Sequence, residues 1–215
     1  MAAALACWIA RTAVAQRGTR DPIADEADSV ARVAGYAVPL RSAPIATGDL
    51  EIRAYIGFGI MIPENFIRIR RHADEVTGAL VLGWPGTTPR FDVPDDPERP
   101  IAQHDQEVWT AAMRNRAKEF GCSDAVRGGW VETCVVEPKR PVDWTSALAE
   151  LRSGGILTLP QQPSRLGLDG TTLYVEIRDG SKYRAYSYWT PDEKSGDAND
   201  RAAARVMDRL LRLFD

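Results

Sequence analysis

Hydrophobic and polar residues alternate in successive segments of the first half of the chain. Every second residue between positions 50 and 56 is apolar, and residues 66–70 repeat the pattern with Ile67 and Ile69 on the apolar side. A period of two is typical of a strand that buries one face. Residues 76–84 are apolar more continuously, which indicates a more central strand. Together these segments predict an antiparallel meander.

Helical periodicity follows in three further segments. The first covers residues 105–120, the second can be capped by Asp143 and ended by the glycine pair at 154 and 155, and the third begins near Asp200. The apolar positions at helical spacing are Trp109, Ala112, Met113 and Phe120 in the first segment, Trp144, Ala147, Leu148 and Leu151 in the second, and Ala203, Val206, Met207, Leu210 and Phe214 in the third.

The clearest hairpin signal lies between residues 173 and 188. Apolar residues alternate up to a turn at residues 178–180, and aromatic and polar residues alternate after it. A three-residue loop with Gly180 in the left-handed conformation predicts that Glu176 pairs with Lys182 and Val175 with Tyr183. The elements together predict an α+β fold, in which an antiparallel sheet made of the meander and this C-terminal hairpin is packed by about three helices.

The first 15 residues have the pattern of a secretory signal peptide. An apolar run covers residues 2–10, and Ala13 and Ala15 stand where cleavage requires small side chains, so we expect cleavage before Gln16. A cationic segment ahead of the apolar run is missing, and a short apolar helix of the fold is the alternative. The run is far shorter than the roughly 20 residues that span a bilayer, so we expect no stable membrane span. The pattern predicts a periplasmic or secreted protein.

The rest of the chain divides into two parts. Residues 16–48 show little periodicity and predict a flexible N-terminal lead-in, and residues 49–215 predict a single α+β domain. Within this domain, residues 85–100 hold five of the 14 prolines and predict a long exposed loop.

Removal of the first 15 residues would leave two cysteines, Cys122 and Cys134. In an oxidising compartment such a pair predicts a disulfide, to which loop-closure entropy gives about 3 kcal/mol of stability. Two reduced, buried cysteines of a cytosolic protein are the alternative. The pair alone cannot form a structural zinc site, because such a site needs four ligands.

The charge of the chain bears on its partners. Its 30 acidic and 27 basic residues give a net charge of −3. A nucleic-acid-binding protein normally presents a strong positive field that collects phosphates. The charge therefore argues against a nucleic-acid partner.

The candidate catalytic residues form no recognisable motif. His104 has acidic neighbours but no second cluster of ligands, which a metal site requires, and His72 is most simply a solvated strand end. Cys122 with His104 as its base would suit a hydrolase, but only as a free thiolate. A carboxylate pair such as Asp92 and Asp95 is the other hydrolase hypothesis. The sequence indicates no catalytic residue, metal site or cofactor.

The hairpin also carries a family resemblance. The segments DGTTLYVEIRDG at residues 169–180 and YRAYSY at residues 183–188 resemble a group of uncharacterised exported bacterial proteins. The resemblance extends to the helix that begins near Trp144, and it implies an exported α+β protein. No activity is established for that group, so the resemblance implies no catalytic residue.

The outer face of the hairpin is the candidate binding surface. Tyr174, Arg184, Tyr186 and Tyr188 are expected to project together with Lys182 nearby, and Tyr and Arg often carry interface energy. The alternatives are that a helix covers this face or that the tyrosines form an ordinary cross-strand ladder. The sequence therefore predicts an exported, non-catalytic binding or interaction protein whose partner is an unidentified protein or small molecule, and a hydrolase is the rival hypothesis.

Overall fold

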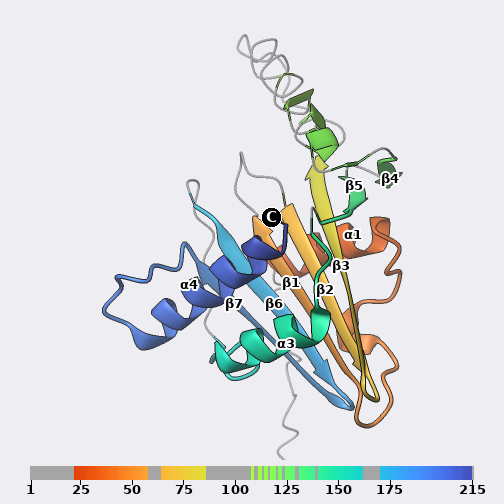
Figure 1. Ribbon diagram of the computed structural model, residues 1–215. Helices are drawn as coiled ribbons and strands as arrows, with labels where there is room; N and C mark the ends of the chain where they lie inside the picture. Colours follow the sequence, from red (N-terminus) through yellow and green to blue (C-terminus); the bar gives the residue numbers. More distant parts are fainter. Residues whose placement is uncertain are drawn as a thin grey trace, which may run out of the picture.

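One antiparallel sheet organises the molecule (Figure 1). The computed structural model describes residues 22–57, 64–85, 121–122, 124–128, 131–138, 140–161 and 170–214, together with residues 108, 111–112, 114–115 and 117–119. The strands are β1 (Leu50–Gly57), β2 (Glu64–His72), β3 (Glu75–Pro85), β4 (Val126–Gly128), β5 (Val131–Val136), β6 (Thr172–Asp179) and β7 (Lys182–Trp189). They lie in the order β4-β5-β3-β2-β1-β6-β7.

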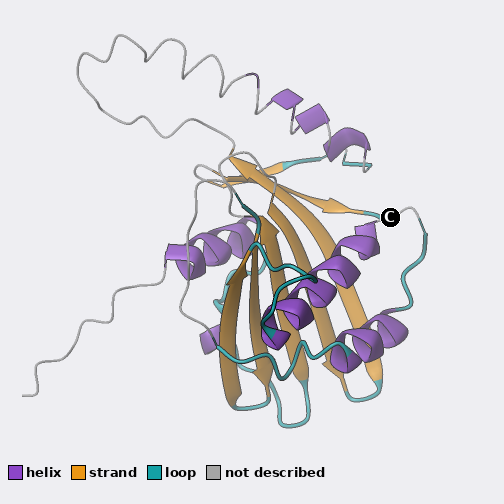
Figure 2. Cartoon of the chain, turned by 90° about the vertical axis from the view of Figure 1, so that its left-hand side faces the viewer, coloured by secondary structure: helices purple, strands orange, loops and turns teal. Residues whose placement is uncertain are grey.

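Helices cover both faces of the sheet. They are α1 (Pro22–Val33), α3 (Trp144–Ser153) and α4 (Ala198–Leu211), with the 3-10 turns η1 (Leu40–Ser42) and η2 (Arg212–Phe214). α3 and α4 lie on one side, here called the α3–α4 face, and α1 lies on the other, the α1 face (Figure 2). The described part of the chain therefore has the predicted α+β class, with an antiparallel meander and a C-terminal hairpin packed by about three helices.

The apolar residues of the meander alternate as the sequence predicts, but the expectation that β1 buries one face is wrong, because all eight of its residues are buried and α1 covers the second face. Ile52 lies opposite Ile69, and Ile67 lies opposite Leu80. All four belong to the core on the α3–α4 face, and none is more than 1% exposed. Because burial of one such side chain contributes about 1.5–3 kcal/mol, this alternation holds the sheet to its helical layer.

The two predicted helices of the C-terminal half are confirmed; α3 has the predicted cap, and α4 begins at Ala198, slightly before the predicted Asp200. The Oδ1 atom of Asp143 accepts hydrogen bonds from the backbone N–H groups of Thr145 at 3.0 Å and Ser146 at 3.2 Å. These bonds satisfy donors that the first turn of α3 leaves free. Gly154 is the C-cap of α3, and Asp197 caps α4 with its side chain.

The C-terminal hairpin is present, but its predicted register is wrong. Gly180 has a φ of +53°, as expected, yet the loop contains two residues and not three. Val175 consequently lies opposite Tyr186, three positions beyond the predicted Tyr183. A shift by an odd number turns every side chain of the second strand to the other face. This register buries Tyr186 and Tyr188 in the core. The free energy gained by burying two large side chains exceeds that of the predicted Glu176–Lys182 pair, which is up to about 1 kcal/mol.

The described part of the predicted N-terminal lead-in contains a helix that the sequence analysis did not predict. Residues 22–33 form α1, which buries Ile23, Ala27 and Val30 against the α1 face of the sheet. The sheet contributes Tyr55 and Phe66 to the same cluster. The sequence does contain this apolar stripe, at positions i, i+4 and i+7. The stripe is difficult to recognise because one of its three residues is an alanine and most of its neighbours are acidic.

Part of the remaining predictions falls outside the described residues. In the helix predicted at residues 105–120, the described positions 111–112, 114–115 and 117–119 are helical, and Ala117 is buried in the core. Residues 86–100 of the predicted loop and the proposed signal peptide at residues 1–15 lie outside the described residues.

Candidate functional site

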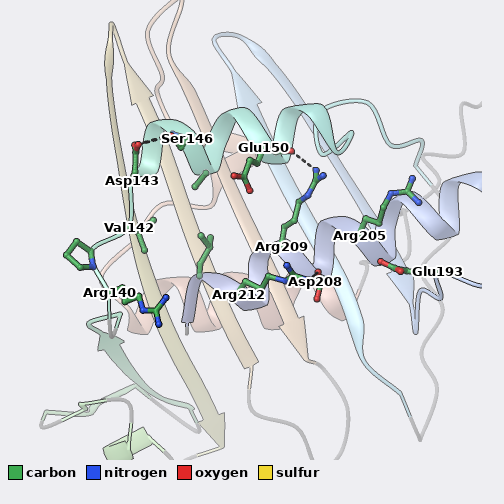
Figure 3. Close-up of a pocket in the computed structure, with 13 residues that line it drawn as sticks. Arg140, Val142, Asp143, Ser146, Glu150, Glu193, Arg205, Asp208, Arg209 and Arg212 are labelled. Atoms are coloured by element: carbon green, nitrogen blue, oxygen red, sulfur yellow. Dashed lines mark hydrogen bonds and ion pairs between the residues drawn. The ribbon is translucent and has the colours of Figure 1, made fainter.

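A cleft lies between α3 and α4 (Figure 3). Its volume is about 650 Å³, which is within the range of about 300–1,000 Å³ that is usual for small-molecule sites. α3 contributes Ser146 and Glu150 to its wall, and α4 contributes Arg205, Asp208 and Arg209. Charged groups of both signs therefore face the same space.

The four arginines of the cleft differ in how they are held. Arg212 pairs with Asp208 at 2.8 Å, and the Nη1 atom of Arg209 donates to a backbone carbonyl of α3 at 2.6 Å. Arg140, which precedes α3, and Arg205 are exposed. Neither forms an ion pair or a side-chain hydrogen bond with any residue that the structure describes. Two guanidinium groups of the cleft are therefore available to a ligand.

The carboxylates of the cleft are also unequal. Asp143 is occupied by its capping role, and its hydrogen bonds with Ser146 hold the pKa of Asp143 below the ordinary 3.8. The hydroxyl of Ser146 donates to Asp143 at 2.7 Å, while Glu150 and Glu193 are exposed. A serine becomes a nucleophile when a base removes its proton, and the described lining places no histidine beside Ser146. The arrangement suits the binding of a polar ligand by charge.

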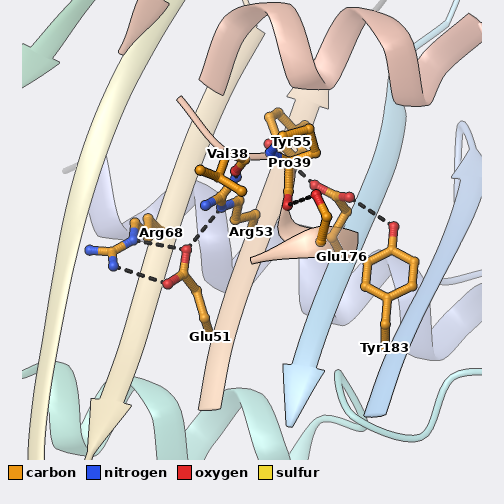
Figure 4. Close-up of polar contacts among 9 residues, drawn as sticks. Val38, Pro39, Glu51, Arg53, Tyr55, Arg68, Glu176 and Tyr183 are labelled. Carbon is orange, nitrogen blue, oxygen red and sulfur yellow. Dashed lines mark hydrogen bonds and ion pairs between the residues drawn. The ribbon is translucent and has the colours of Figure 1, made fainter. Parts of the chain in front are cut away.

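A second polar group lies on the α1 face, where Figure 4 shows its contacts. Glu51 is 5% exposed, and its carboxylate accepts hydrogen bonds from Arg53 at 2.9 Å and from Arg68 at 3.0 and 3.1 Å. Burial alone raises the pKa of Glu51, but the bonds and charges of Arg68 and Arg53 outweigh it and hold the pKa below 4.5. Arg53 also donates to the carbonyl of Val38 at 3.1 Å, which ties the segment after α1 to the sheet.

Glu176 of β6 lies on the same face in the opposite electrostatic situation. It is 1% exposed, and its carboxyl group accepts hydrogen bonds from the hydroxyls of Tyr183 at 2.8 Å and Tyr55 at 3.5 Å. Burial raises the pKa of Glu176 above 4.5; the bond from Tyr183 opposes this rise, and the carboxylate of Asp28 adds to it. The α1 face therefore holds two buried glutamates: Glu51 favours its charged form, and Glu176 favours its neutral form.

The predicted binding face of the hairpin is not an exposed surface. Tyr186 and Tyr188 are each 2% exposed and belong to the core on the α3–α4 face. Arg184 donates to two backbone carbonyls in the segment after α3. Tyr174 is 3% exposed and belongs to the core of the opposite face. The four residues are therefore not brought together, and the alternative of a covered face holds for the three residues of β7.

The hydroxyls of the β7 tyrosines explain how these residues lie in the core. Tyr186 donates to the carbonyl of Ile156 at 2.7 Å, and Tyr188 donates to the carbonyl of Pro160 at 3.2 Å. A buried tyrosine normally needs such a partner for its polar tip. The sequence signal that could have revealed this packing is the apolar stretch at residues 156–159, directly after the glycines that end α3.

The predicted disulfide is present. Cys122 and Cys134 have their sulfur atoms 2.13 Å apart and their Cα atoms 5.9 Å apart. Cys122 follows the helical residues near position 119 and Cys134 belongs to β5, so the bridge ties that segment to the sheet. A bonded sulfur is not a nucleophile, which leaves the Cys122 hydrolase hypothesis without support. His104, Asp92 and Asp95 lie outside the described residues.

His72 ends β2 with its side chain 67% exposed, and it contacts a neighbouring carboxylate. Its Nδ1 atom lies 2.8 Å from Asp49 Oδ2, and this hydrogen bond holds the pKa of Asp49 below 3.8. Among the described residues, no group of three or more His, Cys, Asp or Glu side chains is arranged to hold a metal ion.

Sequence reasoning missed the arginines of the cleft. Arg205 and Arg209 belong to the polar stripe of an amphipathic helix, which looks like any solvated helix face, and no spacing connects them with Arg140. Only the packing of α3 beside α4 brings these side chains to one cleft.

Comparisons of this chain with protein-family models, curated proteins and solved structures found no match. No described helix is both long enough and apolar enough to cross a membrane. Function is therefore inferred from the geometry of the chain itself.

Proposed function

We propose that this chain is a non-catalytic binding protein that works outside the cytoplasm, in the periplasm or as a secreted protein, and that it binds a small anionic ligand between α3 and α4. The observation that carries this proposal is the pair of arginines, Arg140 and Arg205, that line the cleft without a partner among the described residues. An unpaired guanidinium group gains most from a ligand that supplies a carboxylate or phosphate, which it can bind through two parallel hydrogen bonds.

The lining of the cleft supports a polar ligand. Arginines and carboxylates stand beside a few apolar side chains such as Val142 and Leu213. With Asp143 committed to its helix cap and Asp208 paired with Arg212, two unoccupied arginines stand beside two unoccupied glutamates, so the free charges of the cleft balance. A ligand would therefore have to direct its anionic groups toward Arg140 or Arg205 and away from Glu150 and Glu193, while a small apolar part would complement Val142 and Leu213.

Two observations support a location outside the cytoplasm. The bond between Cys122 and Cys134 is of a kind that persists mainly in oxidising compartments. Residues 1–15 combine an apolar run with small residues at positions 13 and 15, as in a signal peptide. Intact-mass measurement on the expressed gene tests this part: a chain that starts at Gln16, with two thiols alkylated only after reduction, would support it, and a full-length chain with open thiols would contradict it.

Calorimetric titration at low salt tests the cleft. The ligands are a panel of small mono- and dicarboxylates and phosphate monoesters, added to the wild type and to the Arg140→Ala and Arg205→Ala variants. Because Arg140 and Arg205 lie at opposite ends of the cleft (Figure 3), a small ligand contacts one of them. Substitution of that arginine is expected to weaken binding by about tenfold or more, because a hydrogen bond to a charged group contributes about 1.5–3 kcal/mol.

Arg152→Ala is the matched control. Arg152 is an exposed arginine of α3 that does not line the cleft, so its removal changes the net charge by the same amount and leaves the cleft intact. Equal weakening in this control, or binding that survives both cleft substitutions, would show that the anions are attracted by overall charge or held elsewhere. Failure of every member of the panel to bind also contradicts the proposal.

A further inference from the structure

Residues 22–42, from α1 through η1, are here called the N-terminal strap, and charged groups attach its second half to the sheet. Arg53 of β1 donates to the carbonyl of Val38 at 3.1 Å (Figure 4). Arg178 of β6 donates to the carbonyl of Arg41 at 3.0 Å. Arg41 in turn pairs with Asp28 of α1 at 2.6 Å. Two arginines of the sheet therefore bind the strap through its backbone carbonyls, and Arg41 joins η1 to α1.

The strap and the sheet each bring a buried carboxyl group to this contact. Asp28 belongs to the strap and is 6% exposed, and its Oδ1 atom has no hydrogen-bond partner among the residues that the structure describes. Glu176 belongs to the sheet and is 1% exposed. Two negative charges repel each other strongly where water is excluded, and a buried carboxylate oxygen without a partner is costly. Ionisation of both groups together therefore weakens the contact.

The other elements packed against Glu176 supply groups of both kinds. Burial and the carboxylate of the strap oppose the charged form of Glu176, whereas hydroxyls and cations favour it. The opposing effects are stronger, so the pKa of Glu176 is raised. The groups that face it are Tyr55 and Arg53 from β1, Tyr183 from β7, and Asp28 and Arg41 from the strap.

We propose that the N-terminal strap is a pH-sensitive cover, which is held closed while Glu176 carries a proton and which loosens when Glu176 ionises beneath it. The direction follows from linkage. A carboxyl group with a raised pKa contributes stability that is fully present below its ordinary value of 4.5 and is lost as the pH rises through the raised value. The strap is therefore tighter in acid than at neutral pH.

Hydrogen exchange of the full-length protein, followed by mass spectrometry between about pH 5 and pH 8, measures the opening of the strap. Rates are corrected for the intrinsic pH dependence of exchange, and α4 on the opposite face serves as the internal reference. A single proton changes the opening constant by at most tenfold per pH unit. We expect the corrected rate of the strap amides to rise by about tenfold or more over this range, while that of α4 stays constant.

Two variants separate this mechanism from general loosening. Glu176→Gln keeps an oxygen for the tyrosine hydroxyls and cannot ionise, so the strap should exchange slowly at every pH. Asp28→Asn removes the opposing charge and should diminish the pH step, measured as the change in log rate, without abolishing it, because the burial of Glu176 remains. Glu75→Gln, at an exposed carboxyl group of β3, should keep the wild-type profile.

Either of two results overturns the proposal. One is a strap whose corrected exchange does not change with pH in the wild type. The other is a pH step that remains undiminished in Glu176→Gln; if that variant does not fold, an undiminished step in Asp28→Asn has the same meaning.

Discussion

Gly78 of β3 lies directly against the indole ring of Trp144 in α3. A Cβ atom built on Gly78 would lie 2.3 Å from the Cε3 atom of Trp144 and 2.4 Å from two further atoms of the same ring. Carbon atoms attract each other near 3.5–4.0 Å, so a methyl group here has to displace the indole by roughly 1 Å. We predict that Gly78→Ala destabilises the protein although alanine is the better strand residue.

The expected magnitude follows from two opposing effects. Overpacking of a well-filled core costs about 1–3 kcal/mol, whereas replacing glycine by alanine within a strand normally gains about 0.5–1 kcal/mol. With all three contacts under 2.5 Å, the upper part of the first range applies, and we expect a net loss of about 2 kcal/mol. For a chain of this length the melting temperature should fall by about 4–8 °C.

Urea unfolding followed by circular dichroism measures this loss, and a double-mutant cycle assigns its cause. In a Trp144→Ala background the indole is gone, so Gly78→Ala should cost nothing. Gly196→Ala is the matched control, because a Cβ at Gly196 meets no atom within 4 Å. An equal cost of Gly78→Ala in both backgrounds would refute the reasoning, since the clash with the ring would then not be its source.

Three further outcomes can be measured in the same way. The double substitution of Cys122 and Cys134 by serine should lower the free energy of unfolding by about 3 kcal/mol, because the bridge closes a loop between cysteines 12 positions apart; an unchanged urea midpoint would contradict this. Tyr186→Phe should cost about 1 kcal/mol through its lost hydrogen bond and Tyr186→Ala about 3–5 kcal/mol, whereas an exposed tyrosine would give nearly no change in melting temperature. The lowered pKa of Glu51 means that its stabilisation is present above 4.5 and is lost as the pH falls through the folded value; Glu51→Gln should therefore flatten the acid limb of the stability curve, and an unaltered limb would show that the arginines do not act on this group.

The features of this fold that the sequence predicts are those that depend on near neighbours. Residues 50–56 alternate because the side of β1 that meets α3 and α4 is apolar, and this pattern requires no knowledge of the partner strand. Asp143 indicates the start of α3 in the sequence, because the backbone groups that its side chain caps are only two or three residues further on. Such local signals gave the meander, the helices of the C-terminal half and the fold class.

The features that the sequence did not reveal depend on distant contacts. Whether Tyr186 meets the core or the solvent is decided by the apolar segment after α3, which lies about thirty positions earlier in the chain. The stripe of α1 is short and rich in alanine, so only the aromatic side chains of Tyr55 and Phe66 show what it covers. The cleft arginines look like solvated surface until two helices are placed side by side. A fold is thus more accessible to pattern reasoning than a binding site.

The central place of β1 also has a consequence for how the chain folds. β1 lies between β2 and β6, so Ile52 is opposite Ile69 on one side and opposite Ile177 on the other. The first pairing is local, whereas the second closes a long loop, and contacts of such high order slow folding. A chain that leaves the ribosome N-terminus first can build β1, β2 and β3 at once, but one edge of an apolar strand stays bare until β6 has been made. During that interval the nascent protein presents a template for intermolecular pairing, and it is then that a chaperone would be most needed.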